Sequence, residues 1–214
     1  MAAEIKSLML EGPAGKLEAL LNAGDPAATH TALICHPHPL FGGTMHNKVV
    51  YNAMKALASF GFPTLRFNFR GTGRSEGKHN EGKGEVEDVR AALDFLHNEF
   101  QLPIIFTGFS FGAATGMRAA CPDEHVTALI SLGTPVVADG RSYAYKFLSA
   151  CTKPKLFISG SQDQYSPATE LREVVNHAAD PKKLVFIEGA DHFFLGKLEL
   201  MQKAIQEWVR ETVL

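Results

Sequence analysis

The stretch PIIFTGFSFG, residues 103–112, decides how this chain folds. Its apolar first half predicts a buried β-strand, and the small residues of 111–120 predict a helix directly after it. A sharp turn from strand to helix strains the backbone of its central residue and lifts that side chain above the sheet. Gly108 and Gly112 suit such a turn, because neighbouring backbone passes too close for a Cβ atom. Ser110 is therefore a candidate nucleophile, although a chain with 19 glycines can also show this pattern in an ordinary turn.

Strand-like and helix-like segments alternate on both sides of this stretch. Short apolar runs separated by helical runs are typical of an α/β fold, a mostly parallel sheet with helices on both faces. We expect about eight strands, the first two forming an antiparallel hairpin. No repeat, low-complexity tract or linker interrupts the pattern, so we expect residues 1–214 to form a single domain. The expected strands are 5–10, 16–21, 31–35, 64–69, 103–109, 127–132, 155–160 and 183–189, and the expected helices are 47–59, 82–99, 111–120, 142–150, 168–178 and 195–212.

Composition excludes several classes of protein. The 214 residues carry a formal net charge of -2, which gives no electrostatic reason to expect nucleic acid or an anionic membrane as a partner. No apolar run is long enough to cross a bilayer, and the start, MAAEIKSLML, lacks the pattern of a secretory signal. Cys35, Cys121 and Cys151 are too widely spaced for a disulfide framework or a zinc site. We therefore expect a cytoplasmic protein with reduced thiols, and nothing in the sequence indicates its oligomeric state.

A serine hydroxyl is a weak nucleophile unless a base accepts its proton. His192 follows directly on the last expected strand, at the sheet edge where the turn at Ser110 also lies. His125 and His177 fall near helix ends or connections and are weaker candidates. We expect His192 to be the base.

The base in turn needs a carboxylate that fixes its tautomer and stabilises its charged form. Asp163 lies in the loop after strand 155–160, in a turn bracketed by glycine and proline. Asp139 is its rival, since it follows strand 127–132. Asp191 adjoins His192, and neighbouring side chains normally diverge, so it is a poor partner for that ring. We favour Asp163, which gives the chain order Ser110, Asp163, His192.

Residues 36–43, HPHPLFGG, allow two interpretations. His36 and His38, with His46 nearby, have donor atoms for zinc, but side chains two residues apart in an extended segment point to opposite sides. The two prolines lack N–H groups and stiffen the loop. We therefore interpret the segment as a loop that aims a backbone N–H at the substrate oxyanion, with no metal bound, and expect the histidine side chains to fix its conformation.

These segments together resemble the α/β-hydrolase superfamily over nearly the whole chain. The matching residues are GFSFG (108–112), GSQD (160–163), GADHFF (189–194) and FRGTGRS (69–75), and the order Ser110, Asp163, His192 is that of the superfamily. HPHPLFGG resembles the oxyanion loop of small, capless members of the dienelactone-hydrolase-like branch. That resemblance implies the Leu40 N–H as one oxyanion donor, with His38 the second choice. A serine replaces the cysteine of dienelactone hydrolases, so their substrate does not carry over.

Two further segments bear on the substrate. Many α/β-hydrolases insert a lid where this chain has only the connection 133–154, which has room for one short helix; we expect an open site. The segment GTGRSEG, 71–77, follows a strand but its third glycine comes one position late for a dinucleotide site. We interpret it as a structural turn and expect no cofactor.

The expected function is a serine hydrolase that cleaves carboxylic esters with short or medium acyl groups, in the manner of a carboxylesterase. The expected partner is a small-molecule ester, with no nucleic acid and no membrane. The Phe111 N–H would be the other oxyanion donor, and Phe41 and Phe193 would line an apolar substrate pocket unless they belong to the core. The alternatives are a thioesterase or small peptidase with the same residues, or a non-catalytic binding protein with this fold.

Overall fold

The computed structural model describes residues 5–137 and 143–214, and its centre is a twisted sheet of eight strands. The strand order is β1-β2-β4-β3-β5-β6-β7-β8. β2 pairs antiparallel with both β1 and β4, and every other neighbouring pair is parallel. The strands are β1 (Ile5–Gly12), β2 (Gly15–Asn22), β3 (Thr31–Cys35), β4 (Thr64–Phe67), β5 (Ile104–Phe109), β6 (Val126–Leu132), β7 (Lys155–Gly160) and β8 (Lys182–Ile187). The predicted α/β fold with a mostly parallel eight-stranded sheet is confirmed.

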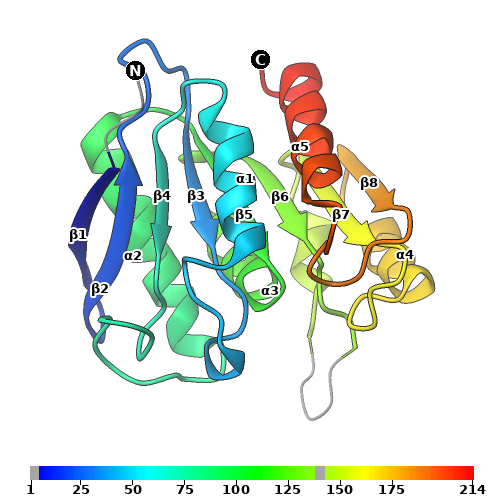
Figure 1. Cartoon of the computed structure of the whole chain (residues 1–214), viewed down its shortest axis with the longest axis horizontal. Coiled ribbons are helices and arrows are strands. Elements are labelled where there is room, and N and C mark those ends of the chain that lie inside the picture. Colours follow the sequence, from blue (N-terminus) through cyan, green and yellow to red (C-terminus); the bar gives the residue numbers. More distant parts are fainter. Residues whose placement is uncertain (1–4, 138–142) are drawn as a thin grey trace.

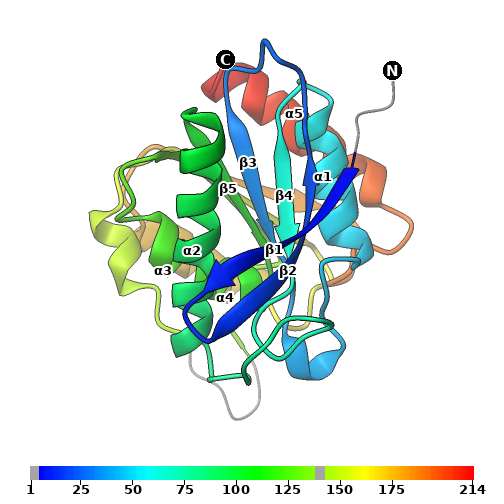
Figure 2. The same cartoon turned by 90° about the vertical axis from the view of Figure 1, so that its left-hand side faces the viewer.

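Helices cover both faces of the sheet (Figures 1 and 2). α1 and α5 lie together on one face, and α2, α3 and α4 lie on the other. The helices are α1 (Lys48–Ala58), α2 (Lys83–Phe100), α3 (Phe111–Ala120), α4 (Ala168–His177) and α5 (Leu198–Thr212), with short 3-10 helices at Pro39–Phe41 and Lys146–Ala150. None of the helices in the described part of the chain is both long and apolar enough to cross a membrane.

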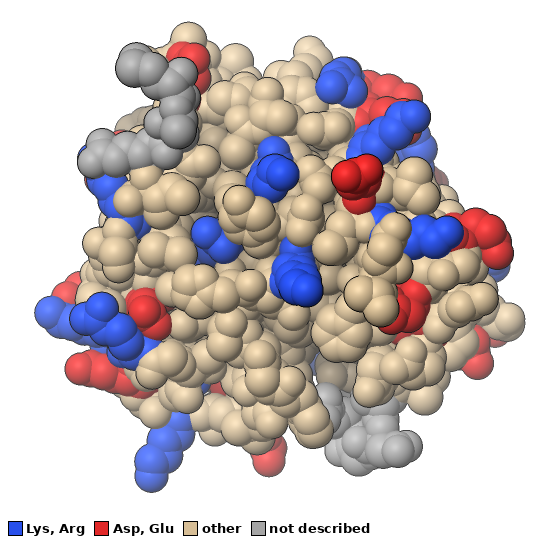
Figure 3. Space-filling view, in the orientation of Figure 1, with Lys and Arg blue, Asp and Glu red and all other residues tan. Residues whose placement is uncertain are grey.

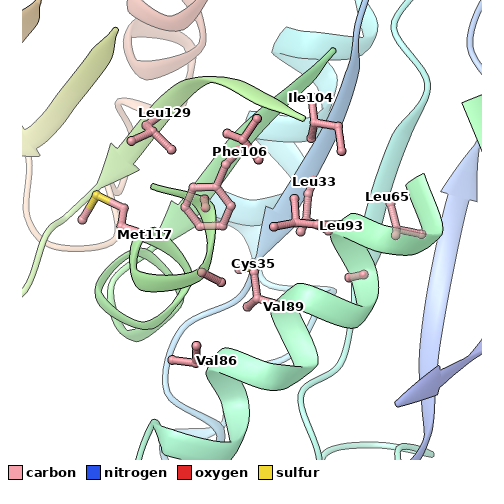
Figure 4. Close-up of a cluster of buried hydrophobic side chains, with 14 of the residues drawn as sticks. Leu33, Cys35, Leu65, Val86, Val89, Leu93, Ile104, Phe106, Met117 and Leu129 are labelled. Carbon is pink, nitrogen blue, oxygen red and sulfur yellow. The ribbon is translucent and has the colours of Figure 1, made fainter. Parts of the chain in front are cut away.

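Each face of the sheet has its own apolar core because strand side chains point alternately to the two sides. On the α2 and α3 side, Leu33, Phe106 and Leu129 from three strands meet Leu93 and Met117 from the helices (Figure 4). All five side chains are buried. This packing holds α3, and with it the turn that precedes α3, against the centre of the sheet.

The surface on the α1 and α5 side carries charges of both signs. Figure 3 shows basic and acidic side chains on that face, separated by larger uncharged areas. Such a distribution is in keeping with the formal net charge of -2.

Several predicted boundaries differ from the structure, among them those of β4, of α5 and of the segment 142–150. β4 ends at Phe67 rather than residue 69, because the Phe69 N–H donates to the His36 ring instead of a strand. α5 begins at Leu198 rather than near Leu195, since Phe194 and Gly196 have φ angles of 53° and 70°. The helix expected at 142–150 is a 3-10 helix at Lys146–Ala150.

The connection between β6 and β7 is where a lid would be inserted. In its described parts, residues 133–137 and 143–154, the 3-10 helix is the only regular element. The prediction of an α/β fold without a sizeable lid is therefore in agreement with these residues.

A substitution at Gly116 tests the contact between α3 and the sheet. A Cβ atom at Gly116 would lie 2.2 Å from Cζ of Phe106. Alanine is the better helix former by about 1 kcal/mol, yet we expect Gly116→Ala to lower the free energy of unfolding by about 1–3 kcal/mol because it overpacks this contact. Urea unfolding measures the change.

The control is the pair of variants Phe106→Leu and Phe106→Leu/Gly116→Ala. Removing the ring should relieve part of the clash, so the double variant should lose less stability than the sum of the single losses. A Gly116→Ala protein as stable as the wild type would contradict this account of the packing.

Candidate active site

The turn between β5 and α3 lies at the edge where the parallel strands end (Figure 1), and Ser110 occupies this turn. Its φ and ψ angles are 54° and -119°, a conformation that side chains other than glycine rarely adopt. A Cβ atom at Gly108 would lie 2.5 Å from Cα of Ala113, and one at Gly112 would lie 2.4 Å from the carbonyl oxygen of His36. Both glycines are therefore required by close backbone, as the sequence predicted. The Ser110 N–H donates to the carbonyl oxygen of Leu132 at 2.9 Å, which ties the turn to β6.

His192 lies in the loop after β8, next to Ser110. Its Nε2 is 3.0 Å from the Ser110 Oγ, and its ring is 3% exposed. The rings of Phe109, Tyr165 and Phe193 surround it, with centroids 5.0, 4.8 and 5.2 Å from its own. These aromatic contacts hold the imidazole in a fixed plane and keep bulk water from most of its surface.

Asp163 lies on the far side of that imidazole. Its Oδ2 is 2.8 Å from the His192 Nδ1, and its Oδ1 accepts the backbone N–H groups of Tyr165 and Ser166 at 2.9 and 3.2 Å. A buried carboxylate held by two N–H groups is fixed in place, and it favours a proton on the facing Nδ1. Nε2 is then the nitrogen that can accept the Ser110 proton.

The other acidic candidates do not compete for this position. The Asp191 Oδ1 accepts the N–H groups of Phe193 and Leu195, so that carboxylate caps its own turn and does not orient His192. Asp139, the rival considered from the sequence, lies outside the residues that the structure describes.

The weaker histidine candidates lie elsewhere. The His125 ring stacks on the His97 ring at a centroid distance of 3.5 Å. The His177 Nδ1 is 2.7 Å from the carbonyl oxygen of Glu173, within α4. The structure thus brings together Ser110, His192 and Asp163, and leaves these two histidines apart from them.

A cavity of about 340 Å³ opens over Ser110 and His192. Phe41 and Phe193 both line it and are 72% and 49% exposed, so they are rim residues and not core residues. Tyr165 lines it as well, although the sequence did not single it out. Its position two residues after Asp163 is the feature by which it could have been found.

Phe111 is the first residue of α3, and its backbone N–H immediately follows the nucleophile candidate Ser110. Among the described residues it has no hydrogen-bond acceptor, as expected for an N–H in the first turn of a helix. It is therefore available to an oxyanion formed at Ser110.

Our choice of Leu40 as the second oxyanion donor is wrong. The Leu40 N–H donates to the Nδ1 of His38 at 3.2 Å, which caps the 3-10 helix Pro39–Phe41, and Leu40 is not among the residues that line the Ser110 cavity. His38, the second choice, does line that cavity. Pro37 and Pro39 have no N–H to offer, and the short helix that begins at Pro39 turns Leu40 away from the cavity.

The His36 side chain fixes this loop from inside. Its Nε2 accepts the Phe69 N–H at 3.0 Å and its Nδ1 lies 2.6 Å from the carbonyl oxygen of Pro37, so both ring nitrogens are already bonded. The ring also packs edge-on against Phe69. His36 thus joins the loop after β3 to the loop after β4, which is the structural role that we expected for it.

The glycine-rich segment after β4 is a turn braced by an ion pair. The Arg70 side chain forms a buried pair with Asp88 on α2, with Nη2 2.7 Å from Oδ1, and the Arg70 N–H donates to the same carboxylate. Gly71, Gly73 and Gly77 all have positive φ angles. The interpretation of 71–77 as a structural turn agrees with this arrangement, whereas the pairing with Asp88 was not evident from the sequence.

Comparisons with known proteins agree with the fold. The model of an alpha/beta hydrolase domain family matches residues 31–211. An alpha-beta serine hydrolase homologue from Coxiella burnetii is 38% identical, with a TM-score of 0.87 over 94% of this chain and 96% of that one. A serine hydrolase without a lid from Xanthomonas campestris is 32% identical, with a TM-score of 0.86 over 97% and 94%. An uncharacterized protein of Rickettsia prowazekii is 36% identical over 94% of this chain and 87% of its own length.

His36 makes the stability of the loop depend on pH. Burial lowers the pKa of His36 from 6.5 to about 3, so the folded chain keeps this ring neutral. The unfolded chain takes up a proton there as the pH falls through 6.5, whereas the folded chain does not until about pH 3. From pH 7 to pH 5 the free energy of unfolding should therefore fall by about 2 kcal/mol more in the wild type than in His36→Asn.

Urea unfolding at the two pH values measures this difference. As a second readout, the imidazole proton signals of His36 in the folded wild type should not shift between pH 7.5 and pH 5. Parallel pH dependences in the two proteins, or a His36 signal that titrates near pH 6.5, would contradict the burial argument.

Proposed function

The chain belongs to the alpha/beta hydrolase family, and from this premise we propose that it is a serine hydrolase that cleaves carboxylic esters. The observation that carries the proposal is the chain of contacts from the Ser110 Oγ to the His192 Nε2 at 3.0 Å and from the His192 Nδ1 to the Asp163 Oδ2 at 2.8 Å. A hydroxyl, an imidazole and a buried carboxylate in that order are what nucleophilic acyl transfer requires.

In the proposed reaction the Ser110 oxygen attacks the ester carbonyl carbon while the His192 Nε2 takes the hydroxyl proton. Asp163 stabilises the imidazolium that results, and the N–H groups of Phe111 and His38 bind the oxyanion. His192 then gives the proton to the departing alcohol, which leaves an acyl group on Ser110. Water, deprotonated by the same imidazole, hydrolyses that acyl-enzyme.

The size and the apolar walls of the cavity over Ser110 are the features that favour an ester. Phe41 and Phe193 give the 340 Å³ cavity apolar walls that suit a short or medium acyl group. A thioester or a small peptide presents the same carbonyl to Ser110, so a thioesterase or peptidase is the second candidate. Comparison of 4-nitrophenyl butyrate, butyryl thioesters and short peptide amides under identical conditions ranks these three classes.

Cytoplasmic location stays a prediction from the sequence.

The reactivity of Ser110 distinguishes a hydrolase from a non-catalytic binding protein with the same fold. We expect a fluorophosphonate probe to label the folded protein at Ser110 and nowhere else. Ser110→Ala should abolish labelling and lower kcat for 4-nitrophenyl butyrate by about 10⁴-fold or more, because the nucleophile is lost. An unlabelled folded wild type would rule out the serine mechanism.

Two neighbouring aspartates offer a matched test of the carboxylate. Asp163→Asn should lower kcat about 10⁴-fold, because an amide at this position no longer selects the imidazole tautomer that accepts the serine proton. Asp191→Asn should leave kcat within about two-fold, since an amide oxygen can still accept the N–H groups of its turn. Steady-state kinetics of both variants, with circular dichroism to verify folding, gives the comparison. Equal losses in the two variants would show that Asp163 has no special role.

A further inference from the structure

A second and larger cavity, of about 980 Å³, adjoins the one above Ser110. His38, Phe41 and Tyr143 line both cavities, so the two spaces are neighbours that share part of the loop after β3 as a wall. The proposed reaction makes no use of the larger one, although its volume is that of a ligand site.

One face of α3 runs from the nucleophile into this second cavity. Phe111, Ala114, Thr115 and Arg118 line it, at the spacing of three and four residues that places side chains on one side of a helix. Ser110 precedes this helix, and eight residues of helix correspond to about 12 Å. Helical side chains also lean toward the N-terminus, which brings the Arg118 guanidinium closer to Ser110 than its Cα.

The wall of the second cavity combines aromatic rings with two cationic side chains. Phe41 and Phe111 supply rings. The Phe111 ring packs on the His38 ring with centroids 4.7 Å apart. The cationic side chains are Lys78, from the loop after β4, and Arg118, from α3.

No acidic side chain in the described part of the chain is paired with either cation, Lys78 or Arg118. Glu81 is the single acidic residue among the described residues of the wall. The Nδ1 of His79, which also lines the cavity, lies 2.9 Å from the buried carboxylate of Glu85 and so faces that group.

We propose that the second cavity is a subsite for an anionic group at the end of one arm of the substrate, a carboxylate or a phosphate. This inference rests on the proposed ester hydrolysis at Ser110. The arm runs from the scissile carbonyl past Phe111 and places its anion between Lys78 and Arg118. The substrate is then an ester with an extended arm of about 12 Å, the length set by the helix between Ser110 and Arg118.

Two pairs of esters test this and separate the two possible arms. Mono(4-nitrophenyl) suberate against 4-nitrophenyl octanoate places the charge on the acyl arm. 4'-Acetoxybiphenyl-4-carboxylate against its carboxamide places the charge on the alcohol arm. The readout is the ratio of kcat/KM for the charged ester to kcat/KM for its neutral partner, measured at low salt because such contacts are screened.

In one of the two pairs we expect Arg118→Gln to lower that ratio about five-fold, mainly through KM, as suits a partly exposed ion pair. Lys78→Gln/Arg118→Gln should lower it further. Arg90→Gln is the matched control, because Arg90 is an exposed arginine on α2 that pairs with Glu87 outside both cavities. Its ratio should equal that of the wild type.

The outcomes separate the two levels of the proposal. Hydrolysis that depends on Ser110, with the same ratio in the wild type and in Lys78→Gln/Arg118→Gln for both ester pairs, would overturn the subsite alone. Absence of any hydrolysis and of fluorophosphonate labelling would overturn the proposed function, and the subsite with it.

Discussion

The strained backbone at Ser110 is the constraint on which the rest of the site depends. A residue with φ of 54° keeps that conformation only if its surroundings hold it there. The hydrogen bond to Leu132 and the missing side chains at Gly108 and Gly112 do so, because they let α3 begin directly against the backbone of β3 and β5. The same close approach places the first N–H of α3 beside the serine oxygen.

Buried polar groups fix the two loops that follow β3 and β4. His36 bonds the loop after β3 to Phe69, and Arg70 bonds the loop after β4 to Asp88. A buried polar group is tolerated when all its hydrogen bonds are made, and it then specifies one arrangement of the chain. The loop after β3, which His36 fixes, also supplies His38 and Phe41 to both cavities. The proposed oxyanion donor and the proposed route of a substrate arm thus both depend on the loop after β3.

Most of the fold was predictable because it follows from local patterns. Apolar runs with helical or strand periodicity gave the elements, and Ser110, Asp163 and His192 each follow directly on a predicted strand, so the edge at which they meet was predictable too. The conformation of the loop after β3 was not: a 3-10 helix of three residues turns Leu40 away from the cavity, whereas His38 lines it. Neither that helix nor the pairing of Arg70 with Asp88 has a periodic signal in the sequence. The helix depends on the packing of one short loop, and the pairing is a contact between residues distant in sequence.

The central claim is that Ser110 carries an acyl group during turnover. Rapid acid quenching of the protein during turnover of 4-nitrophenyl butyrate, followed by mass spectrometry of its peptides, detects that intermediate directly. We predict a butyryl mass increment on the peptide that contains Ser110, formed and lost at rates compatible with kcat. Turnover at full rate with no such adduct, or with an adduct on another residue, would contradict the account.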